Sequence, residues 1–121
     1  MSTYLIIGAS SGIGKQLAEQ LLDSGHKVYA TYFINKPESN FASAEYHYLN
    51  VLDENITFDF LPETIDGLVY CPGSINLRPF ERLKPADFVA DYNLQVTGAI
   101  KTIQAALPRL TQGESASIVL F

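Results

Sequence analysis

The densest set of residues with chemical potential is a glycine- and serine-rich run at 8–14, Gly-Ala-Ser-Ser-Gly-Ile-Gly. An apolar stretch at 4–7 precedes this run, and an amphipathic pattern at 13–22 follows it. A turn from a strand into a helix exposes backbone N–H groups which, with the helix dipole, form an anion site. Glycines let the backbone approach a pyrophosphate, and Ser10 and Ser11 can add hydrogen bonds to phosphate or ribose. The run predicts a phosphate-binding turn, although glycines at such a turn can also serve packing alone.

Two other glycine motifs do not fit this run. Counted from Gly8, the P-loop pattern G-x-x-x-x-G-K-[ST] requires a glycine where Ile13 stands, and the residue after Lys15 is Gln16, which has no hydroxyl. The pattern G-x-G-x-x-G also fails, because Leu17 stands where its last glycine belongs. The spacing present is G-x-x-x-G-x-G, at Gly8, Gly12 and Gly14.

The rest of the chain predicts a sheet that positions this turn. Short apolar, β-branched or aromatic stretches predict strands at 4–7, 27–33, 46–51, 66–71 and 117–121. Amphipathic stretches predict helices at 13–22 and 86–110, and the segments 35–44, 53–64 and 74–85 are predicted as irregular. Largely apolar strands separated by helices indicate a parallel sheet that is covered on both faces. We therefore predict an α/β fold with a doubly wound, Rossmann-like parallel sheet.

Length and composition limit the classes of protein. The chain has 121 residues and a net charge of −5, which favours one domain over 1–121 and argues against nucleic acid or an anionic membrane as partner. One cysteine and two histidines predict neither an internal disulfide nor a metal site. No apolar run reaches the roughly 18 residues of a membrane span, and no basic segment precedes the first apolar stretch. We expect a soluble cytoplasmic protein.

The G-x-x-x-G-x-G turn resembles the cofactor turn of the short-chain dehydrogenase/reductase family, T-G-x-x-x-G-x-G, with Ile7 in place of the threonine. The resemblance covers essentially the whole chain. It implies an oxidoreductase that transfers hydride between NAD(H) or NADP(H) and a small carbonyl or alcohol substrate. It also implies that the turn binds the cofactor through Gly8, Ser10, Ser11, Gly12, Ile13 and Gly14.

Two further segments carry the resemblance. Asn50 and Val51 follow the third strand, where the family has an Asp and an aliphatic residue that contact adenine; Asn50 can equally be the end of a strand. Residues 70–73, Tyr-Cys-Pro-Gly, stand in place of the family's N-N-A-G. The residues implied to pass beside the nicotinamide-side ribose are Cys71, Pro72 and Gly73. Cys71 taken alone fits a small buried hydrophobe.

Asn93 is the candidate catalytic residue of this chain. It occupies a position in the apolar stripe of the helix predicted at 86–110, where a buried amide needs hydrogen-bond partners. A core Asn bonded to a neighbouring carbonyl would explain it. The resemblance implies instead that Asn93 organises a water in the proton relay, in a run resembling N-x-x-x-G that extends to Gly98.

The end of the second strand bears on the choice of cofactor. An acidic residue there would bond the ribose hydroxyls of NAD and repel a 2′-phosphate. Positions 31–34 (Thr-Tyr-Phe-Ile) contain neither an acid nor a base, and Thr31, Asn35 or Lys36 can reach a 2′-phosphate. This pattern favours NADP(H) over NAD(H).

The resemblance also implies a catalytic Ser after the fifth strand and a Y-x-x-x-K on the next helix. Neither is present within residues 1–121. The one Y-x-x-x-K by count, Tyr32 to Lys36, lies on the adenosine side. We therefore expect an inactive cofactor-binding half that either forms a homo-oligomer or pairs with the missing C-terminal half. The alternatives are a non-catalytic dinucleotide-binding module and a truncated fragment without activity.

Overall fold

A five-stranded parallel sheet forms the centre of the molecule, confirming the predicted α/β fold. The computed structural model describes residues 1–10, 12–33, 44–72, 78–111 and 115–121. The strand order is β3-β2-β1-β4-β5, so the order reverses between β1 and β4. The strands are β1 Thr3–Ile7, β2 Lys27–Tyr32, β3 Ala44–Tyr48, β4 Gly67–Tyr70 and β5 Ser117–Leu120.

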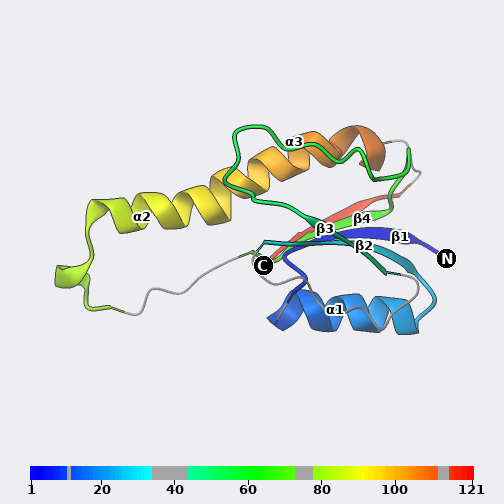
Figure 1. Cartoon of the computed structure of the whole chain (residues 1–121), viewed down its shortest axis with the longest axis horizontal. Helices are drawn as coiled ribbons and strands as arrows, with labels where there is room; N and C mark the ends of the chain where they lie inside the picture. Colours follow the sequence, from blue (N-terminus) through cyan, green and yellow to red (C-terminus); the bar gives the residue numbers. More distant parts are fainter. Residues whose placement is uncertain (11, 34–43, 73–77, 112–114) are drawn as a thin grey trace.

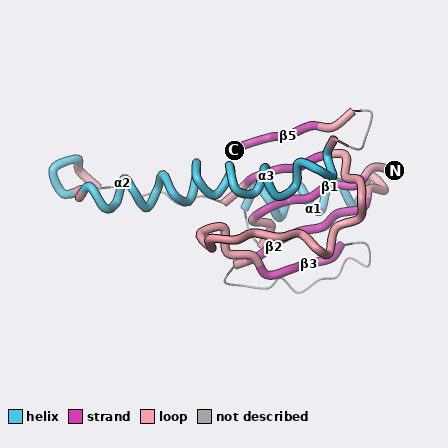
Figure 2. Tube along the Cα trace, turned by 90° about the horizontal axis from the view of Figure 1, so that it is seen from above, coloured by secondary structure: helices cyan, strands magenta, loops and turns pink. Residues whose placement is uncertain are grey.

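Helices cover both faces of this sheet. Helix α1 (Gly12–Asp23) lies on one face and α3 (Gly98–Leu110) on the other, as Figure 1 shows. Helix α2 (Pro85–Tyr92) joins α3 through a π-helical segment, Asn93–Thr97, and projects beyond the sheet. Seen from above in Figure 2, β3 and β5 form the two edges of the sheet.

The core lies in two layers, one on each side of the sheet. Ile6, Ala18 and Val28 are buried between the sheet and α1. The larger layer, beneath α3, includes Phe58, Leu61 and Ile65 from the long connection between β3 and β4. This connection has no regular secondary structure, as predicted, yet its apolar side chains complete the core.

Strand β3 is shifted relative to its predicted position at 46–51. It pairs with β2 from Val28↔Ala44 to Tyr32↔Tyr48, so it begins and ends earlier. Asn50 follows the strand, and its Oδ1 accepts a hydrogen bond of 3.0 Å from the backbone N–H of Leu52. A side-chain acceptor of this kind forms an Asx turn, which ends the strand and redirects the chain.

The predicted irregular segment at 74–85 also needs correction. Phe80–Arg82 form a turn of 3-10 helix directly after Pro79. Pro79 and Pro85 favour an irregular segment in the sequence, but a proline can stand just before a helix or at its first position. For the same reason Pro85 begins α2, where the Asp87 carboxylate accepts the backbone N–H of Lys84 at 2.9 Å.

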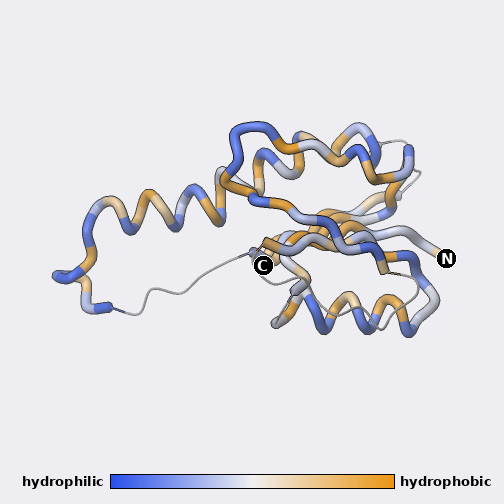
Figure 3. Tube along the Cα trace, in the orientation of Figure 1, coloured by the Kyte–Doolittle hydropathy of each residue, from blue (hydrophilic) through white to orange (hydrophobic). Residues whose placement is uncertain are grey.

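The apolar stripe predicted to be buried along 86–110 is instead largely exposed. Val89, Val96 and Leu107 are exposed, whereas the side chains that face the core are Ala99, Thr102, Ala106 and Leu110. A π-helical turn holds more residues than an α-helical turn, so the segment at Asn93–Thr97 breaks the period of 3.6 residues on which the stripe was based. Figure 3 shows apolar positions along α2, away from the sheet.

Thr102 offers a test of this packing. Its side chain is 0% exposed, and its hydroxyl has no hydrogen-bond partner among the described residues. A buried hydroxyl without a partner costs free energy, so we expect Thr102→Val to raise the free energy of unfolding by about 1 kcal/mol. Urea denaturation measures this difference. The exposed Thr57→Val is the control and should change stability little; a loss of stability in Thr102→Val would contradict the packing.

Candidate functional site

The glycine turn lies at the carboxyl end of β1, between the strand and α1. Gly8 and Gly12 have backbone φ angles of 80° and 60°, in the left-handed region that favours glycine. The backbone N–H of Gly8 donates to the Thr31 hydroxyl at 3.1 Å, and that of Ala9 donates to the Thr31 carbonyl at 2.9 Å. Ile7 stands where the family pattern has a threonine, but Thr31 of β2 supplies a threonine hydroxyl to this turn.

The turn leaves no room for side chains at two of its glycines. A Cβ at Gly14 would overlap the carbonyl oxygen of Gly8, so α1 begins directly against the turn. A Cβ at Gly8 would lie 3.0 Å from the backbone nitrogen of Pro72, which follows β4. The turn after β1 is thus packed against both the helix it begins and the segment that follows the neighbouring strand.

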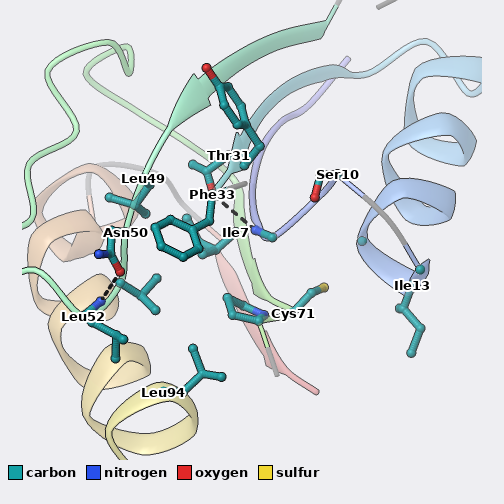
Figure 4. Close-up of a pocket in the computed structure, with 16 residues that line it drawn as sticks. Ile7, Ser10, Ile13, Thr31, Phe33, Leu49, Asn50, Leu52, Cys71 and Leu94 are labelled. Carbon is teal, nitrogen blue, oxygen red and sulfur yellow. Dashed lines mark hydrogen bonds between the residues drawn. The ribbon is translucent and has the colours of Figure 1, made fainter. Parts of the chain in front are cut away.

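A cavity of about 480 Å³ opens at this edge of the sheet. It lies where the strand order reverses, at the carboxyl ends of the strands, which is where open α/β sheets bind ligands. Its volume is in the range of small-molecule and cofactor sites. Every described residue that was predicted to bind a cofactor lines it: Gly8, Ser10, Gly12, Ile13, Gly14, Thr31, Asn50, Val51, Cys71 and Pro72 (Figure 4). Ser11 and Gly73 lie outside the described residues.

The sequence did not identify all of the lining. Phe33, Leu49, Leu52 and Leu94 also line the cavity. Phe33 follows β2, and its ring lies 6.0 Å from that of Tyr48. Figure 4 shows these side chains around the same space as the glycine turn. None of the described lining residues is charged, so the N–H groups at the start of α1 are the described groups best placed to meet a phosphate.

Cys71 contributes a neutral thiol to the cavity wall. It is partly buried, and this burial raises the pKa of the thiol above its ordinary value. Because the thiolate is the nucleophilic form, a raised pKa keeps the group unreactive at neutral pH. Its place in the cavity wall is that of a small lining side chain.

Asn93 does not lie in this cavity. Its side chain is exposed rather than buried, and it lines a second cavity of about 390 Å³ with Leu52, Ala90, Thr97 and Lys101. The Thr97 hydroxyl donates to Asn93 Oδ1 at 3.5 Å. The burial predicted for Asn93 assumed an uninterrupted α-helix, and the π-helical turn that begins at this residue alters which way it faces. Its neighbour Leu94 is the residue that reaches the larger cavity.

Metal-binding clusters and membrane-spanning helices are both absent among the described residues. No group of three or more His, Cys, Asp or Glu among them is placed to hold a metal ion. None of their helices is long and apolar enough to cross a membrane. The two histidines contact other groups: His26 Nδ1 accepts the backbone N–H of Ser2 at 3.0 Å, and His47 stacks on Phe60.

A parallel α/β sheet with a glycine turn and a cavity at its switch point defines a nucleotide-binding class of fold. The family model described as short chain dehydrogenase matches residues 2–121. The chain therefore belongs to the short chain dehydrogenase family. No curated protein sequence matches it at a significant level.

Solved structures of several dehydrogenases share this fold. A short-chain dehydrogenase from Streptomyces avermitilis superposes with a TM-score of 0.81 at 22% identity, over 98% of this chain and 48% of that one. The aldohexose dehydrogenase of Thermoplasma acidophilum gives 0.79 at 20% identity, over 97% and 47%. The serine dehydrogenase of Escherichia coli gives 0.78 at 20% identity, over 96% and 59%. This chain thus spans about half the length of the structures it matches.

Proposed function

We propose that this chain is the cofactor-binding half of an oxidoreductase of the short-chain type, which transfers hydride between NAD(P)(H) and a small carbonyl or alcohol. The observation that carries this proposal is the cavity at the switch point, which gathers every described residue predicted to bind the cofactor around the glycine turn. Its uncharged lining and the backbone approach allowed at Gly8 and Gly14 fit a dinucleotide. When bound, the nicotinamide supplies or accepts the hydride.

The proposed roles of the lining follow their positions. The turn, with Ser10 and Ser11, would hold the pyrophosphate at the N-terminus of α1. Asn50 and Val51 would lie against the adenine, although the Asn50 side chain already bonds the Leu52 backbone. The residues after β4 would pass beside the nicotinamide-side ribose: Cys71, Pro72 and Gly73.

The preference between the two cofactors depends on the end of β2. The Thr31 side chain is 1% exposed and its hydroxyl bonds the Gly8 backbone, which favours a role in shaping the turn over one in binding a 2′-phosphate. Phe33 beside it is uncharged. The preference for NADP(H) therefore rests on Asn35 and Lys36, which lie outside the described residues. Parallel titrations with NADPH and NADH decide between the cofactors.

We propose that the remaining catalytic groups come from outside this sequence. The resemblance would make Asn93, which lines the second cavity, the organiser of a water in the proton relay, and a Ser, Tyr and Lys would complete the set. The apolar side chains of β5 support this proposal, because Ile118, Val119 and Leu120 are all exposed at an edge of the sheet. Such an edge is normally paired or covered. A C-terminal half of the same protein would cover it, and a second copy of the chain would be the other candidate.

The test uses the full-length protein that contains this sequence. Binding of NADPH and NADH is followed by fluorescence, and hydride transfer by nicotinamide absorbance with a panel of alcohols and carbonyl compounds. We expect binding and turnover with at least one substrate class. Binding without turnover would favour a non-catalytic dinucleotide-binding module. No binding of either cofactor would contradict the proposed function.

A further inference from the structure

Tyr70, the last residue of β4, makes an unusual contact with the helical layer. Its side chain is 1% exposed, and its hydroxyl donates a hydrogen bond of 2.5 Å to the backbone carbonyl of Leu94. Burial raises the pKa of Tyr70 to about 12, so the hydroxyl keeps its proton and remains a donor at neutral pH.

The acceptor of this bond belongs to the π-helical segment. In a regular α-helix the N–H of Gly98 would donate to the carbonyl of Leu94. Here the N–H of Gly98 donates to the carbonyl of Asn93 instead, one residue further back. The Leu94 carbonyl has lost that partner, and the Tyr70 hydroxyl takes its place.

Gly98 provides the space for this hydroxyl. A Cβ at Gly98 would overlap the Tyr70 hydroxyl oxygen and would lie 3.2 Å from two side-chain atoms of Val51. The hydroxyl therefore reaches the helix because residue 98 has no side chain. Tyr70, Leu94 and Gly98 thus form one matched contact between the sheet and the π-helical turn.

Two departures from the family pattern meet in this contact. Tyr70 stands where the family pattern begins N-N-A-G, and the run from Asn93 to Gly98 has four intervening residues where the N-x-x-x-G that it resembles has three. A π-helical turn accommodates the additional residue. The contact also reaches the larger cavity, because Cys71, which follows Tyr70 directly, and Leu94 both line it (Figure 4).

We propose that Tyr70 is a positioning residue, whose hydroxyl fixes the π-helical turn and thereby places Leu94 in the dinucleotide cavity and Asn93 outside it. This inference rests on the proposed function, because it assigns the cavity to a dinucleotide. Tyr70 itself is buried, and it acts through the Leu94 backbone. Loss of the hydroxyl would free the turn that carries Leu94 and that meets Val51 at Gly98, so it would disturb the side of the cavity assigned to the adenine.

The first test compares two nucleotides in the full-length protein. Tyr70→Phe removes only the hydroxyl, and we expect it to weaken NADPH binding about tenfold. The affinity for ADP, which has only the adenosine side of the cofactor, should fall by a similar factor, because the turn packs against Val51. Tyr4→Phe is the matched control: Tyr4 lies in β1, and its ring packs against His26 rather than lining the cavity, so neither affinity should change.

The second test is a double-mutant cycle on stability. Gly98→Ala places a methyl group against the Tyr70 hydroxyl and should lower the melting temperature, and adding Tyr70→Phe should recover part of that loss. If the effects of Gly98→Ala and Tyr70→Phe on the melting temperature are additive, the proposed contact between these two residues is wrong. Weaker binding of NADPH with unchanged binding of ADP, or no change in either, would overturn the positioning role while leaving the proposed function intact. If the wild-type protein binds no nucleotide, the proposed function itself fails.

Discussion

Gly14→Ala is expected to lower the free energy of unfolding by about 3 kcal/mol, at the upper end for overpacking, and dinucleotide affinity by about 100-fold. The added methyl would overlap the Gly8 carbonyl oxygen and would lie 3.0 Å and 3.1 Å from two further backbone atoms, in Gly8 and Ala9. Backbone atoms cannot rotate away as a side chain does. The start of α1 must therefore move, and with it the N–H groups that face the cavity. Urea denaturation and NADPH titration measure the two effects.

Gly25→Ala is the control for this substitution. Gly25 follows α1 and has a φ of +85°, but a Cβ there would meet no atom within 4 Å. We expect a loss of about 1 kcal/mol from the left-handed conformation alone, with nucleotide affinity unchanged. If Gly14→Ala binds NADPH as well as wild type does, the turn is not the cofactor site.

Phe58→Ala is expected to cost about 3–5 kcal/mol of unfolding free energy. Phe58 is 1% exposed, and it packs in the core layer beneath α3 although it comes from an irregular segment. Removing the ring leaves a cavity that Leu61 and Ile65, its buried neighbours in the same connection, cannot fill without moving. Equilibrium denaturation in urea gives the difference from wild type.

Phe80→Ala is the matched control for the core substitution. Phe80 is 80% exposed, and truncating it should change stability by no more than about 0.5 kcal/mol. The packing described for Phe58 is contradicted if Phe58→Ala costs less than about 1 kcal/mol of unfolding free energy, or if Phe58→Ala and Phe80→Ala cost the same.

The candidate site was predictable from the sequence because it depends on topology. Once the apolar strands are parallel, their carboxyl ends gather at one edge, so the residues after β1, β3 and β4 must meet there. The resemblance to the short-chain dehydrogenase family assigned Asn50 and Pro72 to the same cofactor site as Gly8, and the structure contains one cavity that all three line. Phe33 was noted only for its lack of charge, because nothing local indicates that its ring lines a cavity.

The features that escaped prediction depend on contacts distant in sequence. The hydrogen bond from Gly8 to the Thr31 hydroxyl follows from the register of β1 on β2, in which Ile6 pairs with Ala30. Phe58 is buried, but its segment has neither the helical nor the strand periodicity of apolar residues, so no sequence pattern predicts this burial.

The orientation predicted for the helix at 86–110 was wrong because its helical period is interrupted. A constant spacing of three and four residues was assumed through 86–110, and the π-helical turn interrupts it. The side chains that face the sheet in α3 are small, among them Ala99 and Ala106, and a search for large apolar residues passes over them. Asn93 was placed on a buried face for the same reason.

The central claim is that the cavity at the glycine turn binds a nicotinamide dinucleotide. Isothermal titration of the full-length protein with NADPH and NADH, each repeated with the Gly14→Ala variant, tests it most directly. We expect one site per chain, with a Kd below about 1 mM for at least one cofactor, competition by ADP, and loss of the heat signal in the variant. Absence of binding by the wild-type protein, or equal binding by a folded Gly14→Ala variant, would contradict the claim.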